Sequence, residues 1–174
     1  MGVRGPGWAI VGMLMLAGGT LADETGAAIA LDRLGGRVTR DESLPGSPVI
    51  DVDLAGTRIT DVWLKVVPEL TGLRSLTLEG TRVTDAGVKE LRELKELQSL
   101  NLSRTRLTDA GLKELRGLKT LRTLDLAVTD VTDAGLKELK DLKGLQTLRL
   151  DSTRVTDVGV KALQAALPDC RIIR

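Results

Sequence analysis

The sequence predicts an α/β solenoid: a short right-handed arc with parallel strands on the concave face and helices on the convex face. Three observations support this fold class. Residues 49–168 are five consecutive copies of one 24-residue unit, with no insertion between copies. Each copy begins with apolar residues at alternate positions, as in a short strand. Each then continues with apolar residues at every third position, as on the inner side of a helix. A fixed period of this length is typical of proteins whose repeats stack on one another.

The strand half of the unit is clear in the copy at residues 73–96. Leu76 and Leu78 alternate with polar residues, so both leucines are expected to point inward and their neighbours outward. A threonine follows the strand at the same position in every copy. Because a hydroxyl both donates and accepts hydrogen bonds, a column of threonines could satisfy backbone groups of the turns, as an asparagine ladder does. The column consists of Thr57, Thr81, Thr105, Thr129 and Thr153.

The helix half of the unit begins with a Thr-Asp pair. Thr84 is a suitable N-cap, and Asp85 follows in the first turn, where the helix dipole favours a negative charge. Lys89 comes four residues after Asp85, in the order that favours an ion pair along a helix. The sequence therefore predicts an Asp–Lys pair in each copy: Asp61–Lys65, Asp85–Lys89, Asp109–Lys113, Asp133–Lys137 and Asp157–Lys161.

A glycine recurs near the start of the helix in the second to fifth copies, at Gly87, Gly111, Gly135 and Gly159. Glycine inside a helix costs about 1 kcal/mol relative to alanine, so its recurrence indicates close backbone packing between repeats. The first copy has Trp63 at this position. A terminal repeat lacks a repeat neighbour on one side, so we expect Trp63 to pack on a cap; a binding hot spot is the alternative.

The first 22 residues resemble an export signal. Arg4 precedes an apolar run, and small residues surround a possible cleavage point after Ala22. The run is too short to span a bilayer comfortably, since a spanning helix needs about 20 apolar residues. We therefore expect a cleaved signal and an exported protein, whether periplasmic, cell-surface or secreted. An uncleaved anchor is the main alternative.

Two segments flank the repeats and are expected to cap the solenoid. Residues 23–48 contain a short amphipathic helix, a possible strand and a turn, and the open face of the first repeat must be covered. Residues 169–174, after Pro168, are expected to form a C-terminal capping strand. Cys170 lies there and is expected to be a small buried apolar residue.

Composition limits the function classes. The 25 Lys and Arg residues nearly balance the 24 Asp and Glu residues, which gives no electrostatic reason to expect nucleic acid or an anionic membrane as partner. The chain has no histidine, the commonest general base and metal ligand. A single cysteine excludes an internal disulfide framework and a cysteine-rich zinc site. No cofactor and no membrane insertion of the processed chain are expected.

The pattern LxxLxLxxTxVTDxGLKxLxxL, repeated in phase five times, resembles the leucine-rich repeat family. Its form is similar to the ribonuclease-inhibitor-like and F-box-associated branch, especially bacterial proteins built from LTDAGLKEL units. The resemblance covers about residues 49–174. It implies a curved solenoid that binds another protein through its concave face. No F-box precedes the repeats, so a ubiquitin-ligase adaptor role is not supported. At about 4.8 Å per strand, five repeats form only a shallow arc.

The outward positions of the strands are the candidate binding surface, because they vary between copies whereas the inward leucines hardly change. By repeat position they hold five acids and one base, which predicts a mildly acidic face and a polar or basic protein partner. Arg149 is the only residue there of the types enriched at hot spots, so modest affinity is expected. The candidate partner-binding residues are Asp51, Asp53, Thr77, Glu79, Asn101, Asp125, Arg149 and Asp151.

Other readings of the chain remain open. The concave face could be a plain solvated surface. The protein could instead be a structural envelope or surface component that self-associates through sheet edges at Val49 and Ile172. A hydrolase would have to use Asp51 and Asp53, which share a face, but a shallow face offers little burial. The sequence has no Ser–His arrangement, zinc motif or phosphate-binding loop, so we expect no enzyme.

A column of arginines follows the threonine column: Arg58, Arg82, Arg106 and Arg154. Asp130 occupies the same position in the fourth copy. Stacked like charges repel, so the expected role of Asp130 is to relieve this repulsion. An anion site along this edge is the alternative.

Overall fold

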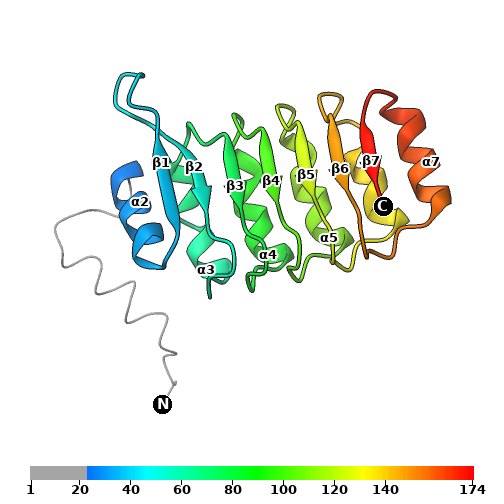
Figure 1. Cartoon of the computed structure of the whole chain (residues 1–174), viewed down its shortest axis with the longest axis horizontal. Coiled ribbons are helices and arrows are strands. Elements are labelled where there is room, and N and C mark those ends of the chain that lie inside the picture. Colours follow the sequence, from blue (N-terminus) through cyan, green and yellow to red (C-terminus); the bar gives the residue numbers. More distant parts are fainter. Residues whose placement is uncertain (1–22) are drawn as a thin grey trace, which may run out of the picture.

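The computed structural model describes residues 23–174, which form one open sheet with helices along one side (Figure 1). β1 pairs antiparallel with β2, and every later neighbouring pair is parallel. The seven strands lie in chain order: β1 (Arg37–Arg40), β2 (Val49–Asp53), β3 (Ser75–Thr77), β4 (Ser99–Asn101), β5 (Thr123–Asp125), β6 (Thr147–Arg149) and β7 (Arg171–Ile173). The predicted α/β solenoid arc is confirmed. The predicted export signal lies outside the described residues.

The convex side consists of short helices. In the middle repeats a single α-helical turn continues directly into a 3₁₀ helix. The buried residues Val88, Leu91 and Leu94 are three apart, which matches the three residues per turn of a 3₁₀ helix. The helices are α2 (Glu24–Arg33), α3 (Asp61–Leu64), η2 (Val67–Glu69), α4 (Asp85–Val88), η3 (Lys89–Glu93), α5 (Asp109–Leu112), η4 (Lys113–Gly117), α6 (Asp133–Leu136), η5 (Lys137–Leu139) and α7 (Asp157–Ala166). None of them is long and apolar enough to cross a membrane.

The core is a stack of aliphatic residues between the sheet and the helices. The strand register aligns one inward residue from each repeat. These residues are Val52, Leu76, Leu100, Leu124 and Leu148, each at most 1% exposed. Because every repeat supplies the same shape to its neighbours, the core extends through the chain without aromatic residues, apart from half-buried Trp63 at its N-terminal end.

The threonine column acts within each turn and not between repeats. The hydroxyl of Thr105 donates to the carbonyl oxygen of Leu102, three residues earlier, at 2.6 Å. The other four threonines make the same bond at 2.6–2.7 Å. Each hydroxyl therefore satisfies a backbone carbonyl of its own turn, which confirms the role predicted for the threonine column.

The link between repeats comes from the aspartates at the helix starts. One carboxylate oxygen of Asp109 accepts the backbone N–H of Thr132 at 2.8 Å, and the other accepts the Thr132 hydroxyl at 2.7 Å. We call this two-bond contact the Asp–Thr clamp. The predicted Asp–Lys pairs are wrong, because no such ion pair forms in residues 23–174. Four of the five carboxylates reach the next repeat instead, and that of Asp157 pairs with Arg174. The clamps are Asp61–Thr84, Asp85–Thr108, Asp109–Thr132 and Asp133–Thr156.

The Asp133–Thr156 clamp also changes the pKa of the Asp133 carboxyl group. The hydroxyl of Thr156, and then its backbone N–H, hold the pKa of Asp133 below the ordinary value of 3.8. Folding lowers this pKa, so the carboxylate contributes stability that is fully present above pH 3.8. The contribution is lost as the pH falls through the lower pKa of the folded state. The clamp is therefore intact at neutral pH and weakens only in strong acid.

The recurrent glycines make room for the clamps. A Cβ atom at Gly135 would lie 2.3 Å from a carboxylate oxygen of Asp109, and the other three glycines face the preceding aspartate in the same way. In the first copy no repeat precedes Trp63, so no clamp occupies this space. The half-buried Trp63 instead packs against the hydrophobic core.

The N-terminal segment covers the first repeat. β1 pairs along the outer edge of β2, so the expected open sheet edge at Val49 is wrong. The Glu24 carboxylate accepts the backbone N–H of Val49 at 2.7 Å and also pairs with Arg40 at 3.1 Å. α2 is thereby fixed to the start of the sheet, with Ala27 and Leu31 fully buried.

The C-terminal end is finished by α7 and β7. The Gln164 side-chain amide donates to the backbone carbonyls of Leu167, Pro168 and Cys170, which closes the turn between these elements. Cys170 is a free thiol and is 3% exposed. Burial raises the pKa of this thiol, so Cys170 behaves as a small apolar core residue.

The turn after each repeat strand contains one residue in the left-handed conformation. Glycine takes this position in the first two copies, whereas Val128 takes it in the fourth with φ +57°. A β-branched side chain is strained there by about 1–2 kcal/mol. We expect Val128→Gly to stabilise the protein by about 1 kcal/mol in chemical denaturation, although glycine gains freedom in the unfolded chain.

The control for this prediction is Val158→Gly, which removes another exposed valine from a right-handed helical position in α7. That substitution should destabilise the protein by about 1 kcal/mol. If both substitutions changed the free energy of unfolding in the same direction, backbone strain at Val128 would not be the cause of its effect.

Candidate binding face

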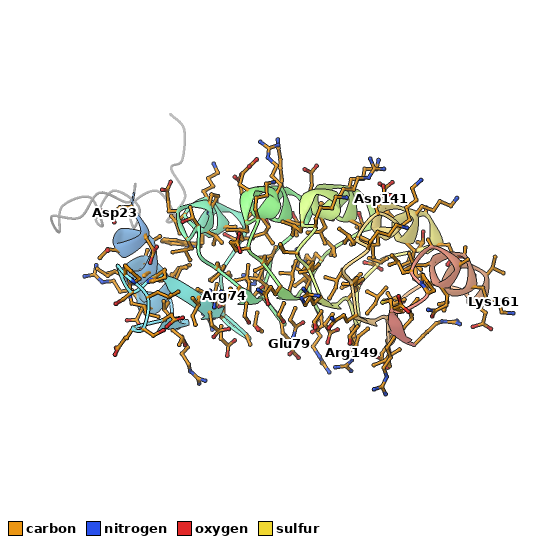
Figure 2. The ribbon with its side chains drawn as sticks, turned by 90° about the horizontal axis from the view of Figure 1, so that it is seen from above. Asp23, Arg74, Glu79, Asp141, Arg149 and Lys161 are labelled. Carbon is orange, nitrogen blue, oxygen red and sulfur yellow. The ribbon has the colours of Figure 1, made fainter. Side chains whose placement is uncertain are left out.

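The strand register places the predicted binding residues on one continuous face. Asp53, Thr77, Asn101, Asp125 and Arg149 stand side by side in one row across β2 to β6. Asp51 belongs to the neighbouring row, and Glu79 and Asp151 follow their strands in the turns. Figure 2 shows Glu79 and Arg149 on the sheet side, opposite Asp141 on the helix side. The fold therefore gathers all eight predicted residues on the sheet side.

Arg149 is held between two carboxylates. Its guanidinium contacts Asp125 at 3.1 Å and Asp151 at 3.4 Å. The Arg149 side chain is 50% exposed, whereas that of Asp125 is only 13% exposed. Asp125 also accepts the backbone N–H of Ala127 at 2.9 Å, which fixes its position. Arg149 is thus a preoriented cation with half of its surface available to a partner.

A second polar group surrounds Glu79. Its carboxylate contacts the side-chain amide of Asn101 at 3.4 Å and the guanidinium of Arg104 at 3.5 Å. Asn101 in turn accepts the hydroxyl of Ser103 at 2.7 Å. Arg104 is absent from the predicted residues, because the alternation of the strand does not extend to the left-handed turn residue that follows it.

The balance of charge on this face differs from the prediction. Arg37 on β1 lies directly across from Asp53, and Arg171 on β7 lies directly across from Thr147. With Arg104 and Arg149, four arginines accompany the five acids, so the face is closer to neutral than the repeat positions alone predicted. The two outer arginines could not be assigned from the repeat pattern, because β1 and β7 belong to the caps.

The two carboxylates that a hydrolase would use are half-exposed on β2. One oxygen of Asp53 accepts the backbone N–H of Ala55 at 3.0 Å, so this group stabilises the turn. Within residues 23–174 no group of three or more potential ligands is arranged to hold a metal ion.

The arginine column lies beside the binding face. Arg154 pairs with Asp130 at 3.1 Å, and both side chains are largely exposed. This contact agrees with the expectation that Asp130 relieves repulsion between stacked arginines. An exposed pair of this kind contributes at most about 1 kcal/mol.

Comparison with family models agrees with the geometry. Two leucine-rich repeat models match the chain, one over residues 71–131 and the other over residues 145–163. Together with the parallel sheet and its helices, these matches support a leucine-rich-repeat solenoid. No curated protein matches the chain in sequence.

Solved structures share the fold. Internalin C2 from Listeria monocytogenes is 30% identical with a TM-score of 0.54, over 62% of this chain and 44% of that chain. The present chain therefore spans less than half the length of the internalin. The leucine-rich-repeat ectodomain of the receptor kinase SOBIR1 from Arabidopsis thaliana is 17% identical with a TM-score of 0.58, over 87% and 90% of the two chains. The PEPR1–AtPEP1 complex is 19% identical with a TM-score of 0.51, over 78% and 19%.

Proposed function

We propose that the chain is a non-enzymatic binding module that holds a protein partner on its concave face. The observation that carries the proposal is the preoriented Arg149, half-exposed between Asp125 and Asp151. Arginine is enriched at binding hot spots, and a guanidinium fixed before binding loses less freedom when a partner arrives. The contact residues would be Asp51, Asp53, Thr77, Glu79, Asn101, Asp125, Arg149 and Asp151.

The surroundings of Arg149 suit a polar partner of mixed charge. Arginines lie at both ends of the face and acids lie between them, so a partner with one sign of charge would meet repulsion somewhere along its length. The two outward rows across β2 to β6, which begin at Asp51 and Asp53, contain no large apolar side chain. Affinity would therefore depend on charge-assisted hydrogen bonds more than on apolar burial.

The setting of this interaction would be outside the cytoplasm. The apolar leader at residues 1–22 supports export, and one solved structure of the same fold is a receptor ectodomain. The TDAG-type units support assignment to the ribonuclease-inhibitor-like and F-box-associated branch of the family. The proposed export and the proposed family branch both go beyond what the shared fold shows.

The proposal can be tested with a matched pair of arginine variants. Arg149→Ala should lower the capture of a partner from an extracytoplasmic extract about tenfold or more, because it removes a preoriented contact. Arg154→Ala, which also breaks an exposed Arg–Asp pair, should leave capture unchanged. A photo-crosslinking residue at Thr77 should form adducts with the same partner, and one at Lys113 on the convex side should not. Adducts from Lys113 alone would contradict a concave binding face.

Self-association is the second candidate, and β7 favours it. The outer edge of β7 has no neighbouring strand in residues 23–174, and its centre is the half-buried Ile172. Unpaired strand edges readily pair with another chain. Light scattering over a range of concentrations measures the mass of the protein in solution and so separates this candidate from the first. An Ile172→Pro variant should lower that mass only if the chain self-associates through β7.

A further inference from the structure

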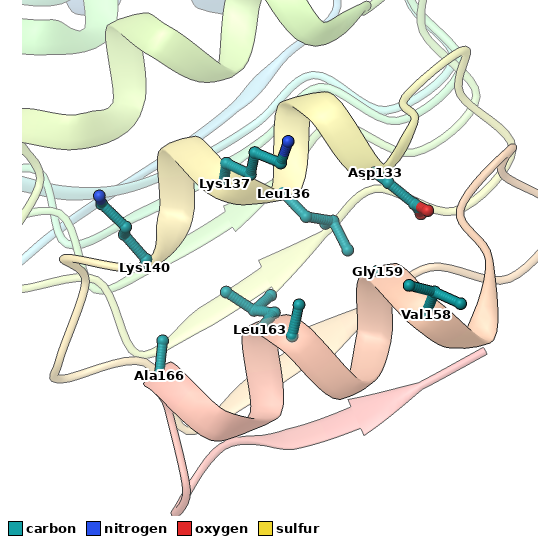
Figure 3. Close-up of a pocket in the computed structure, with 9 residues that line it drawn as sticks. Asp133, Leu136, Lys137, Lys140, Val158, Gly159, Leu163 and Ala166 are labelled. Atoms are coloured by element: carbon teal, nitrogen blue, oxygen red, sulfur yellow. The ribbon is translucent and has the colours of Figure 1, made fainter.

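A groove on the convex side lies between α6–η5 and α7, far from the concave face (Figure 3). Its volume is about 370 Å³, within the range of small binding pockets. Leu136 and Leu163 point toward one another at its floor, and Val158 lies at one end. Val158 is 75% exposed, the largest value among the exposed large apolar residues of the described chain.

The groove exists because one side chain is missing from the repeat pattern. Glu138 in the fourth copy reaches back to Arg116 in the third copy, and the Glu138 side chain is only 14% exposed in the space between them. One period later, the same two positions are Ala162 and Lys140. The carboxylate that closes the preceding interface is therefore absent from the last one.

Loss of this carboxylate leaves a positive rim above an apolar floor. Lys137 and Lys140 both line the groove, and neither forms an ion pair within residues 23–174. The one acid in the lining, Asp133, already uses both oxygens in its clamp to Thr156. Small residues on α7, including Gly159 and Ala166, keep the groove open along the helix.

We propose that this groove binds an amphipathic helix of a partner protein that carries acidic residues beside its apolar face. A carboxylate from the partner would take the place that Glu138 occupies in the preceding interface, next to Lys140. Its apolar residues would cover Val158, Ala162 and Ala166. α7 has ten residues, or about 15 Å of helix, which matches an occupant of two to three turns. The surface is separate from the proposed concave site.

The groove can be tested with synthetic helical peptides of about four turns. The acidic probe carries Leu at i, i+4 and i+7 with Glu at the flanking positions. The basic probe replaces each Glu with Lys, and a third probe replaces each Leu with Ser. Fluorescence anisotropy should show binding of the acidic probe alone, weakened by added salt. Equal binding of the acidic and basic probes, or no binding of the acidic probe, would overturn the proposal.

Ala162→Glu is the decisive variant, because it restores the carboxylate that closes the preceding interface. It should raise the Tm and lower affinity for the acidic probe about tenfold or more. Its matched control is Ala165→Glu, the same change at an exposed position of α7 outside the groove, which should leave affinity unchanged. Equal losses in both variants would overturn the assignment to this groove.

The remaining variants distinguish the occupants. Lys140→Glu should weaken binding of the acidic probe, whereas the charge-matched Lys89→Glu should leave that binding unchanged. Concentration-dependent dimerisation abolished by Ala162→Glu would show instead that the groove binds a second copy, and would overturn the proposal. Arg149→Ala should leave binding of the acidic probe intact, so failure at this groove and failure at the concave face are separate results.

Discussion

Gly159→Ala should destabilise the protein by about 1–3 kcal/mol, against the usual gain of about 1 kcal/mol when alanine replaces glycine in a helix. A Cβ at Gly159 would lie 2.1 Å from a carboxylate oxygen of Asp133 and 2.4 Å from its carboxyl carbon. That carboxylate cannot move aside without breaking its two bonds to Thr156. Denaturant unfolding monitored by circular dichroism measures the effect.

Two further variants identify the cause of this loss. Gly117→Ala places a Cβ no closer than 3.6 Å to any neighbour outside its own helix, so it should be neutral or slightly stabilising. In an Asp133→Ala background, Gly159→Ala should cost much less than in the wild type, because the clashing carboxylate is gone. Additive effects of the two substitutions would exclude the clamp as the reason for the glycine.

Asp109→Ala should destabilise the protein by about 2 kcal/mol. The substitution removes the acceptor of two hydrogen bonds and leaves the backbone N–H of Thr132 without its partner at a half-buried position. Because stacked repeats are stabilised mainly by their interfaces, loss of a central clamp should also broaden the unfolding transition. Thermal and denaturant unfolding, each followed in the far ultraviolet, measure both effects.

Asp157→Ala is the natural control for this prediction. Asp157 holds the same position in the last copy, where no further repeat offers a threonine, and its largely exposed side chain pairs with Arg174. The substitution should leave stability almost unchanged. Comparable losses for Asp109→Ala and Asp157→Ala would show that the aspartates act through their own helices and not through the next repeat.

The repeat period was sufficient to predict the architecture. Five copies in phase place Leu76, Leu100 and Leu124 at equivalent positions, and equivalent positions of a solenoid must stack. The same reasoning assigned the outward residues of the strands, so the row from Asp53 to Arg149 could be named before any contact was known. The glycine column also indicated close packing, although not the group that packs there.

The partners of the polar side chains could not be predicted in the same way. A local rule favoured Asp109 with Lys113, four residues away, whereas the structure pairs Asp109 with Thr132, 23 residues away. Likewise, the charge of the concave face depends on Arg37 and Arg171, which lie in caps that do not follow the repeat.

The sequence alone determined that this chain is a stack of repeats with an aliphatic core and a variable polar face, because the burial of apolar side chains follows the period of the chain. Only the tertiary structure decided how the repeats are joined and where charges remain unpaired. A carboxylate bonds to whatever donor lies within about 3 Å, and the neighbour that comes so close is set by the stacking of whole repeats. The clamp of Asp109, the preoriented Arg149 and the position of Lys140, which forms no ion pair within residues 23–174, all result from that stacking.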